Sequence, residues 1–142
     1  MVVRSSLDAS RLLGYLNFEP QEVVVALYLD NHCRLIELRE IFRGTVNSTV
    51  AHPREILQGA LWANAVSILI AHNHPSGLSA PSEEDLKFTQ KLREGCELLG
   101  LQLVDHLILG RENYFSFADL GWPEPKLPSP VLSRTLNRLD FR

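Results

Sequence analysis

Residues 65–85 read AVSILIAHNHPSGLSAPSEED and determine the fold predicted for the chain. The uncharged run Ala65–Ala71 is typical of a strand that is buried on both faces. Proline, serine and glycine then predict a loop, and a helix is expected to begin at Ser82, because serine is a preferred N-cap residue. Two histidines, His72 and His74, follow the strand directly, so a functional site is expected at its carboxyl end.

Helical and strand patterns flank this stretch on both sides. Apolar residues at spacings of three and four predict helices, and β-branched apolar runs predict strands. Helices are expected from Ser6 or Asp8 to Asn17, from Pro53 after His52, and from Ser82 to Leu99, and strands at Glu22–Leu29, Arg34–Phe42, Ala65–Ala71, Leu101–Leu109 and Tyr114–Phe117. The first two strands are expected to form an antiparallel hairpin. This order of elements predicts an α/β fold in which a mixed β-sheet is flanked by helices.

Residues 1–121 are predicted to form one domain, since a chain of this length can bury a single hydrophobic core. Residues 122–142 contain four prolines between positions 123 and 130 and are expected to form a proline-rich C-terminal extension outside the core. A short helix is expected over Val131–Leu139. The segment Thr45–Val50 is expected either to extend the second strand or to be irregular.

The composition of the 142-residue chain is that of a globular protein, with 45% hydrophobic and 22% charged residues. A formal net charge of -3, without a run of Lys or Arg, argues against general binding to nucleic acid, which needs clustered cations. Cys33 and Cys96 have neither metal-binding nor disulfide spacing and are expected to be reduced thiols. The sequence has no signal-peptide pattern and no apolar run long enough to cross a bilayer, so we expect a cytoplasmic protein without a membrane partner.

His72, His74 and Asp85 form a candidate metal site. In an extended segment alternate side chains point to the same side, so both imidazoles are expected to face one direction. Asp85 lies eleven residues after His74, on the first turn of the predicted helix. Two imidazoles and one carboxylate suit Zn²⁺ with its fourth position open, as in catalytic zinc sites. A structural interpretation also stays open, in which the histidines are buried hydrogen-bonding residues and Asp85 caps the helix with Ser82.

The spacing His72-x-His74, seven residues, then Ser82-x-x-Asp85 resembles the H-x-H-x₇-S-x-x-D signature of the JAMM (MPN+) metalloproteases. The closer resemblance is to the bacterial RadC family, also called UPF0758 or JAB-domain proteins. The segments that carry it are Gly44-Thr45-Val46-Asn47, His52-Pro53-Arg54-Glu55, AHNHPSG at 71–77 and Asp105-His106-Leu107-Ile108. The likeness extends from Glu19 to Gly121 and implies a JAB/MPN domain, a sandwich similar to that of the cytidine deaminases.

The resemblance implies a Zn²⁺ ion that is held by His72, His74 and Asp85, with water in the fourth position. It also implies a glutamate near the start of the first core strand that acts as general base and acid. Glu22 matches this glutamate by position. The rival candidates for the base are Glu19, Glu40 and Glu55.

Ser82 matches the serine of the JAMM signature, which is thought to stabilise the tetrahedral oxyanion, although serine at a helix start is also a natural N-cap. His106 follows Asp105 in a motif that matches the family. It is expected either to be structural or to hydrogen-bond a metal ligand. His52 and His32 are expected to be cap or turn residues and not ligands.

The implied function is that of a zinc-dependent metallopeptidase or isopeptidase, which cleaves an amide bond in a peptide or protein conjugate through a metal-activated water. The alternative is a non-catalytic JAMM-fold binding module in a DNA-associated or mobile-element complex. An intact ligand set favours the enzyme, because a scaffold does not need an open coordination position. A zinc nucleobase deaminase is excluded, since the sequence contains neither H-x-E nor P-C-x-x-C.

Overall fold

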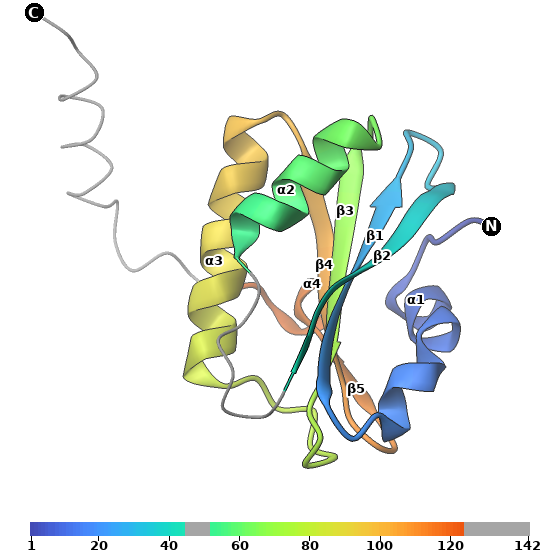
Figure 1. The fold of residues 1–142 in the computed structure, drawn as a ribbon, viewed down its shortest axis with the longest axis vertical. Helices are drawn as coiled ribbons and strands as arrows, with labels where there is room; N and C mark the ends of the chain where they lie inside the picture. Colours follow the sequence, from blue (N-terminus) through green and yellow to red (C-terminus); the bar gives the residue numbers. More distant parts are fainter. Residues whose placement is uncertain (45–51, 124–142) are drawn as a thin grey trace, which may run out of the picture.

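The structure, a computed structural model, describes residues 1–44 and 52–123. These residues form a five-stranded β-sheet in the order β2-β1-β3-β4-β5, with helices on both faces (Figure 1). The strands are β1 (Glu22–Leu29), β2 (Leu35–Gly44), β3 (Ser67–Asn73), β4 (Gln102–Leu109) and β5 (Tyr114–Ser116). The helices are α1 (Ser6–Leu12), α2 (Pro53–Trp62), α3 (Glu83–Leu98) and α4 (Phe117–Leu120), with a 3₁₀ helix over Gly14–Phe18.

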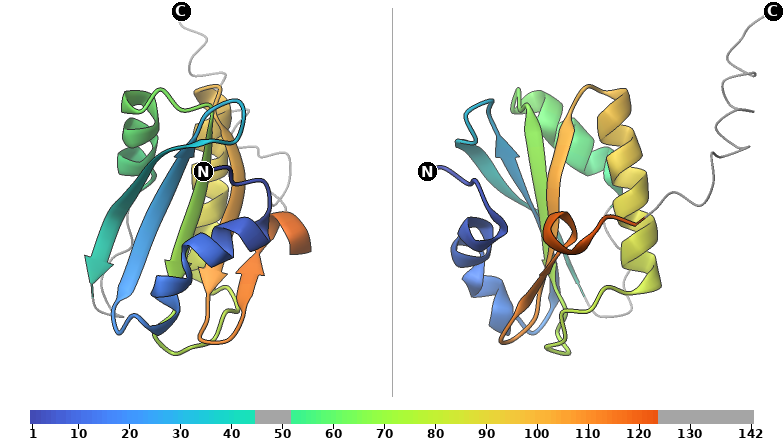
Figure 2. Two further views of the ribbon diagram at one scale, coloured as in Figure 1. Left: turned by 90° about the vertical axis from the view of Figure 1, so that its right-hand side faces the viewer. Right: turned by 180° about the vertical axis from the view of Figure 1, so that it is seen from behind.

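The sheet is mixed. β1 pairs antiparallel with both β2 and β3, β3 pairs parallel with β4, and β4 pairs antiparallel with β5. The parallel pair is joined by α3, since parallel strands need a long crossover connection. Figure 2 shows α1 on one side of the sheet, with α2 and α3 on the other. The predicted α/β fold with a mixed sheet flanked by helices is confirmed.

Both faces of the central strands are buried, which explains their continuous apolar sequence. On the face covered by α1, Leu27 of β1 belongs to a buried cluster with Leu13. On the opposite face, Ile70 of β3 is buried together with Ile56 of α2 and Leu92 of α3. Because β1 and β3 are held from two sides, their ends are rigid supports for polar groups.

A β-bulge in β4 changes which side chains face each layer. The pairing with β3 skips Val104, so Leu103 and Asp105 lie opposite consecutive residues of β3. Leu103 packs on the face covered by α2 and α3, whereas Val104 packs on the face covered by α1. Simple alternation from Leu103 would place Asp105 on the α2 and α3 face. The bulge places His106 there instead, in contact with α3.

Two predicted boundaries near the core are corrected by the structure. The first helix ends at Leu12 and not at Asn17, and the chain continues as a 3₁₀ helix from Gly14, a residue that weakens α-helices. The central strand is Ser67–Asn73 and not Ala65–Ala71. Its start is later because the Ala65 N–H donates to the carbonyl of Ala60 at the end of α2, at 2.9 Å.

The last predicted strand is also shorter than expected. β5 ends at Ser116, whose hydroxyl accepts a hydrogen bond from the Asp119 N–H at 3.1 Å and thereby caps α4. The predictions for Thr45–Val50 and Val131–Leu139, and most of the predicted extension 122–142, lie outside the described residues. None of the helices within residues 1–44 and 52–123 combines the length and apolar character that a bilayer crossing requires.

Candidate metal centre

Three structural elements meet at one end of the sheet. β3 ends at Asn73, so His72 is inside the strand and His74 is the first residue beyond it. Asp85 lies on the first turn of α3. The carboxyl end of β3, the start of β1 and the start of α3 all lie at the lower end of the sheet in Figure 1. The fold therefore brings side chains from separate parts of the sequence to one place.

The ligand atoms of His72, His74 and Asp85 lie close enough to share one ion. His72 Nε2 is 3.1 Å from His74 Nε2 and 3.2 Å from Asp85 Oδ1, and His74 Nε2 is 3.0 Å from Asp85 Oδ2. A tetrahedral Zn²⁺ ion with bonds of about 2.0–2.1 Å would hold its ligand atoms about 3.3 Å apart. His72 and Asp85 are buried and His74 is half-buried. The geometry therefore suits one small cation.

The outer nitrogens of both imidazoles are already hydrogen-bonded. His74 Nδ1 lies 3.0 Å from the carbonyl oxygen of Leu78, and His72 Nδ1 lies 2.9 Å from His106 Nε2. Because a carbonyl oxygen only accepts, His74 Nδ1 carries the proton of the neutral ring and Nε2 carries the lone pair. Metal-binding histidines are usually held by such a second partner on the nitrogen that is not coordinated. The donor set thus fits a metal ion.

The charges of the cluster favour a cation. Burial alone would raise the pKa of Asp85, but its hydrogen bonds with His72 and His74 lower that pKa well below the usual range of a carboxyl group. The same hydrogen bond with Asp85 raises the pKa of His74, although burial acts in the opposite direction. Asp85 is therefore a fixed negative charge beside the two imidazoles.

Asp85 is held in place by a capping box at the start of α3. The Ser82 backbone N–H donates to Asp85 Oδ2 at 2.9 Å, and the Asp85 backbone N–H donates to Ser82 Oγ at 3.1 Å. The predicted N-cap role of Ser82 is confirmed. Its hydroxyl accepts in this arrangement, and the part of the chain that the structure describes supplies no acceptor for the hydroxyl proton. Ser82 is exposed, so this proton is accessible to a ligand.

Glu22 opens β1 beside the cluster. The β1–β3 register pairs Val24 with His72, so Glu22 lies two residues nearer the strand end, on the same face as His72. Burial raises the pKa of Glu22, while His72 opposes this effect and Asp85 adds to it. The pKa of Glu22 therefore depends on the charges of the cluster.

The three rival glutamates occupy different positions. Glu19 and Glu40 both form ion pairs with Arg43. Glu55 is exposed on the first turn of α2. Of the four candidates, Glu22 is the one that opens a strand paired with the strand of His72.

The other predicted histidine positions agree with the structure in part. His52 is the N-cap residue of α2 but makes no side-chain cap bond, and His32 lies in the turn after β1. Both are exposed. His106 is fully buried and contacts His72 as described above. Within the described residues, the three-residue cluster that could hold a metal consists of His72, His74 and Asp85.

The sequence did not reveal the roles of Asn73 and Thr89. Asn73 hydrogen-bonds the backbone on both sides of Glu22. Thr89 contacts His106 and the carbonyl of Asp85. The available signals were weak: Asn73 lies between the two histidines, and Thr89 lies one helical turn after Asp85, on the same helix face.

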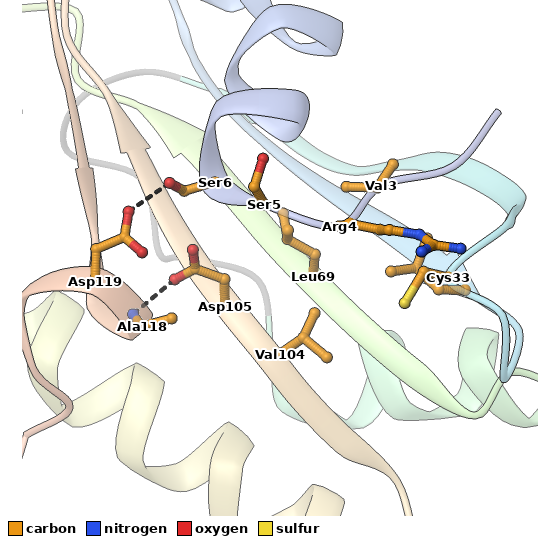
Figure 3. A pocket seen from close by; sticks show the side chains of 11 residues that line it. Val3, Arg4, Ser5, Ser6, Cys33, Leu69, Val104, Asp105, Ala118 and Asp119 are labelled. Carbon is orange, nitrogen blue, oxygen red and sulfur yellow. Dashed lines mark hydrogen bonds between the residues drawn. The ribbon is translucent and has the colours of Figure 1, made fainter.

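The structure also contains a cavity of about 190 Å³ that is separate from the cluster (Figure 3). It lies on the α1 face, where Ser6, Cys33, Asp105 and Asp119 are among the lining residues. Asp105 there accepts a hydrogen bond from the Ala118 N–H at 2.9 Å. Because neighbouring strand residues point to opposite faces, Asp105 lines this cavity whereas His106 faces the cluster. The cavity therefore offers no access to the candidate ligands.

The chain is similar to one family of known proteins. The family model described as RadC-like JAB domain matches residues 3–122. A UPF0758 protein of Histophilus somni (strain 2336) is 47% identical over 102 residues, which are 72% of this chain and 46% of the relative. A UPF0758 protein of Streptococcus uberis is 44% identical over 118 residues, which are 83% of this chain and 52% of the relative. The chain thus spans about half the length of the curated relatives it matches.

Proposed function

We propose that this chain, which belongs to the family of RadC-like JAB domains, is a zinc-dependent hydrolase that cleaves an amide bond in a peptide or protein conjugate. The observation that carries the proposal is the convergence of one ring nitrogen each from His72 and His74 with the Asp85 carboxylate. Three protein ligands leave a fourth position open, which is the arrangement of catalytic zinc sites.

His72, His74 and Asp85 would hold the ion. Two imidazole nitrogens and one carboxylate oxygen suit Zn²⁺ better than a hard cation such as Mg²⁺ or Ca²⁺, which prefers oxygen ligands. When bound, Zn²⁺ supplies Lewis acidity, which polarises a carbonyl group and makes water more acidic. The protein contributes the rigid β3–α3 frame that sets the ligand positions before the ion arrives.

Glu22 acts as general base and then as general acid. Its carboxylate takes a proton from the attacking water and delivers this proton to the nitrogen of the leaving amine, so the C–N bond breaks without a free amide anion. The pKa of Glu22, which burial raises, makes this carboxylate a stronger base than an exposed glutamate. This supports a role in transferring protons near neutral pH.

Ser82 stabilises the developing oxyanion. Its Oγ accepts the Asp85 N–H, which leaves the hydroxyl proton to donate to the substrate oxygen as negative charge develops there. The cap and the catalytic role therefore use different parts of the same hydroxyl group.

Metal analysis and one substitution test the proposal. The purified chain should contain one zinc per molecule, and Glu22→Gln should keep the metal but abolish hydrolysis of a fluorogenic library of peptides and lysine-linked isopeptides. Glu55→Gln, which changes an exposed glutamate on α2, is the matched control and should retain activity.

Each outcome has a separate meaning. A chain that binds no zinc contradicts the metal site. Full hydrolysis by Glu22→Gln shows that the base is elsewhere. Stoichiometric zinc without hydrolysis of any library member contradicts an enzyme and favours a JAMM-fold binding module.

A further inference from the structure

A third histidine lies behind the candidate ligands. His106 Nε2 is 2.9 Å from His72 Nδ1, and His106 Nδ1 is 2.5 Å from Thr89 Oγ1. The Thr89 hydroxyl is also 2.7 Å from the backbone carbonyl of Asp85. His106 and Thr89 are both fully buried. A series of three hydrogen bonds therefore links the backbone carbonyl of Asp85, through Thr89 and His106, to the ring of His72.

The donor and the acceptor in each of these hydrogen bonds follow from the protons that each group can offer. The Asp85 carbonyl only accepts, so the single hydroxyl proton of Thr89 is donated to it. Thr89 Oγ1 then accepts the Nδ1–H of His106. A neutral imidazole with a proton on Nδ1 has its lone pair on Nε2, so His106 accepts the Nδ1–H of His72. His72 is left with its Nε2 lone pair directed toward His74 and Asp85.

We propose that Thr89 and His106 are positioning residues that fix the Nδ1–H tautomer of His72 and so direct its Nε2 lone pair to the metal position. The inference of a metal role rests on the proposed function, whereas the tautomer is a property of the metal-free chain.

The two ligand histidines are oriented by different means. The Nδ1 of His74 faces the carbonyl of Leu78, which can only accept. The Nδ1 of His72 faces an imidazole, which can either donate or accept. His106 therefore needs its own fixed partner, and Thr89 is that partner because the Asp85 carbonyl fixes the hydroxyl proton.

A competing interaction favours the other tautomer of His72, and the hydrogen bonds of Thr89 and His106 oppose it. Asp85 Oδ1 lies 3.2 Å from His72 Nε2 and, without a metal, attracts a proton to that nitrogen. A proton on Nε2 blocks the lone pair that a metal needs. The hydrogen bond from His72 Nδ1 to His106 opposes this second tautomer.

Packing alone explains the position of the His106 ring but not its polar contacts. The ring stacks on Phe117 with centroids 5.1 Å apart. The test therefore changes polarity at constant shape: Thr89→Val removes the hydroxyl and keeps the volume, and Thr89→Ser keeps the hydroxyl. The Asp85 carbonyl belongs to the α3 backbone. In Thr89→Val it therefore keeps a helical N–H donor, although it loses the hydroxyl.

The first measurement is the tautomer of each histidine in the metal-free full chain, by ¹H–¹⁵N correlation of the ring nitrogens at a pH where the imidazoles are neutral. The wild type and Thr89→Ser should carry the proton of His72 on Nδ1. In Thr89→Val the Nε2–H tautomer of His72 should become populated. A wild-type His72 with its proton on Nε2 overturns the proposal without any variant. An unchanged tautomer in folded Thr89→Val also overturns it.

The second measurement is zinc affinity, by competition with a chromophoric chelator. Loss of a hydrogen-bonding partner behind a ligand typically weakens metal binding by about 10- to 100-fold, which is the loss expected for Thr89→Val, with recovery in Thr89→Ser. Wild-type affinity in Thr89→Val contradicts the positioning role while the proposed function stands. A wild type that binds no zinc, but has the expected tautomers, contradicts the proposed function and leaves the hydrogen-bond chain intact.

Discussion

The side-chain oxygen of Asn73 accepts a hydrogen bond from the backbone N–H of Val23 at 2.7 Å. The amide nitrogen of the same side chain donates to the carbonyls of Glu19 and Gln21 at 3.2 and 2.9 Å. These bonds attach the chain on both sides of Glu22 to the residue that lies between the two candidate ligand histidines. Asn73 is buried, so the attachment is protected from water.

Asn73→Asp should destabilise this attachment without changing its shape. Aspartate keeps an acceptor for Val23 but loses both donors and places a carboxylate beside the carbonyls of Glu19 and Gln21. We expect the free energy of unfolding of the metal-free chain to fall by about 1–3 kcal/mol in denaturant titrations, since buried carbonyls would lose their donors. If Glu22 is the base, hydrolysis should fall while zinc remains bound.

The matched control for this change is Asn64→Asp. Asn64 is exposed and has a φ of 58°, a conformation that aspartate also tolerates. Its effect on the free energy of unfolding should stay within about 0.5 kcal/mol. Equal losses in the two variants would show that the three bonds of Asn73 contribute nothing specific.

The parts of the fold that depend on local sequence could be predicted. Glu22–Leu29 was predicted as a strand and has these bounds, because a run that is buried on both faces is apolar throughout. The proximity of the candidate ligands could also be predicted, because His72 and His74 lie at the end of one element, Asp85 lies at the start of the next, and the loop between them contains turn-forming proline and glycine.

The environment of the candidate ligands could not be predicted, because it depends on pairing between distant strands. Whether Asp105 or His106 faces His72 is decided by the bulge at Val104, and alternation along β4 gives the wrong face. The role of Asn73 depends in the same way on the register between β1 and β3. A one-residue difference in either would turn these side chains to the opposite face.

Gly59→Ala should destabilise the packing of α2 on the sheet. A Cβ at this position would overlap the hydroxyl group of Tyr28, which donates to the carbonyl of Ile56 at 2.9 Å. Overpacking of this kind costs about 1–3 kcal/mol, which offsets the gain of about 1 kcal/mol from the better helix propensity of alanine. A lower midpoint in urea, with an unchanged slope, is the expected result.

Gly14→Ala is the counterpart of this change in an open position. Apart from Gly14 itself, its two chain neighbours and the backbone of its own helix, no heavy atom of residues 1–44 and 52–123 lies within 4 Å of an added Cβ at Gly14. Its effect should be neutral or stabilising by up to about 1 kcal/mol, since alanine restricts the unfolded chain. Stabilisation by both substitutions would contradict the close contact between Gly59 and Tyr28.

Two aspartates should contribute to stability with opposite pH dependence. Burial raises the pKa of Asp105, although the hydroxyl of Ser116 donates to it at 2.6 Å. Its contribution is therefore complete below the unfolded pKa and is lost as pH rises through the raised folded pKa. Hydrogen bonds from the backbone of Arg34 and His32 lower the pKa of Asp30, so its contribution is present above the unfolded pKa and is lost as pH falls through the lowered one.

Denaturant titrations of Asp105→Asn and Asp30→Asn at a series of pH values measure this difference. The loss in unfolding free energy caused by Asp105→Asn should shrink from acid to neutral pH, and the loss caused by Asp30→Asn should grow. Parallel pH profiles for the two variants would rule out the opposite shifts in pKa.

Zinc should stabilise the chain through His74, because a ligand that binds only the folded state adds its binding free energy to stability. At a free zinc concentration of 100 times the Kd, the gain is about 2.7 kcal/mol, which corresponds to a rise in Tm on the order of 10 °C. His74→Ala removes one of three candidate ligands and should abolish the rise in thermal unfolding scans. His52→Ala changes an exposed histidine that makes no side-chain cap bond, and it should preserve the rise in full. An equal rise in wild type and His74→Ala would mean that the ion binds outside the His72, His74 and Asp85 cluster.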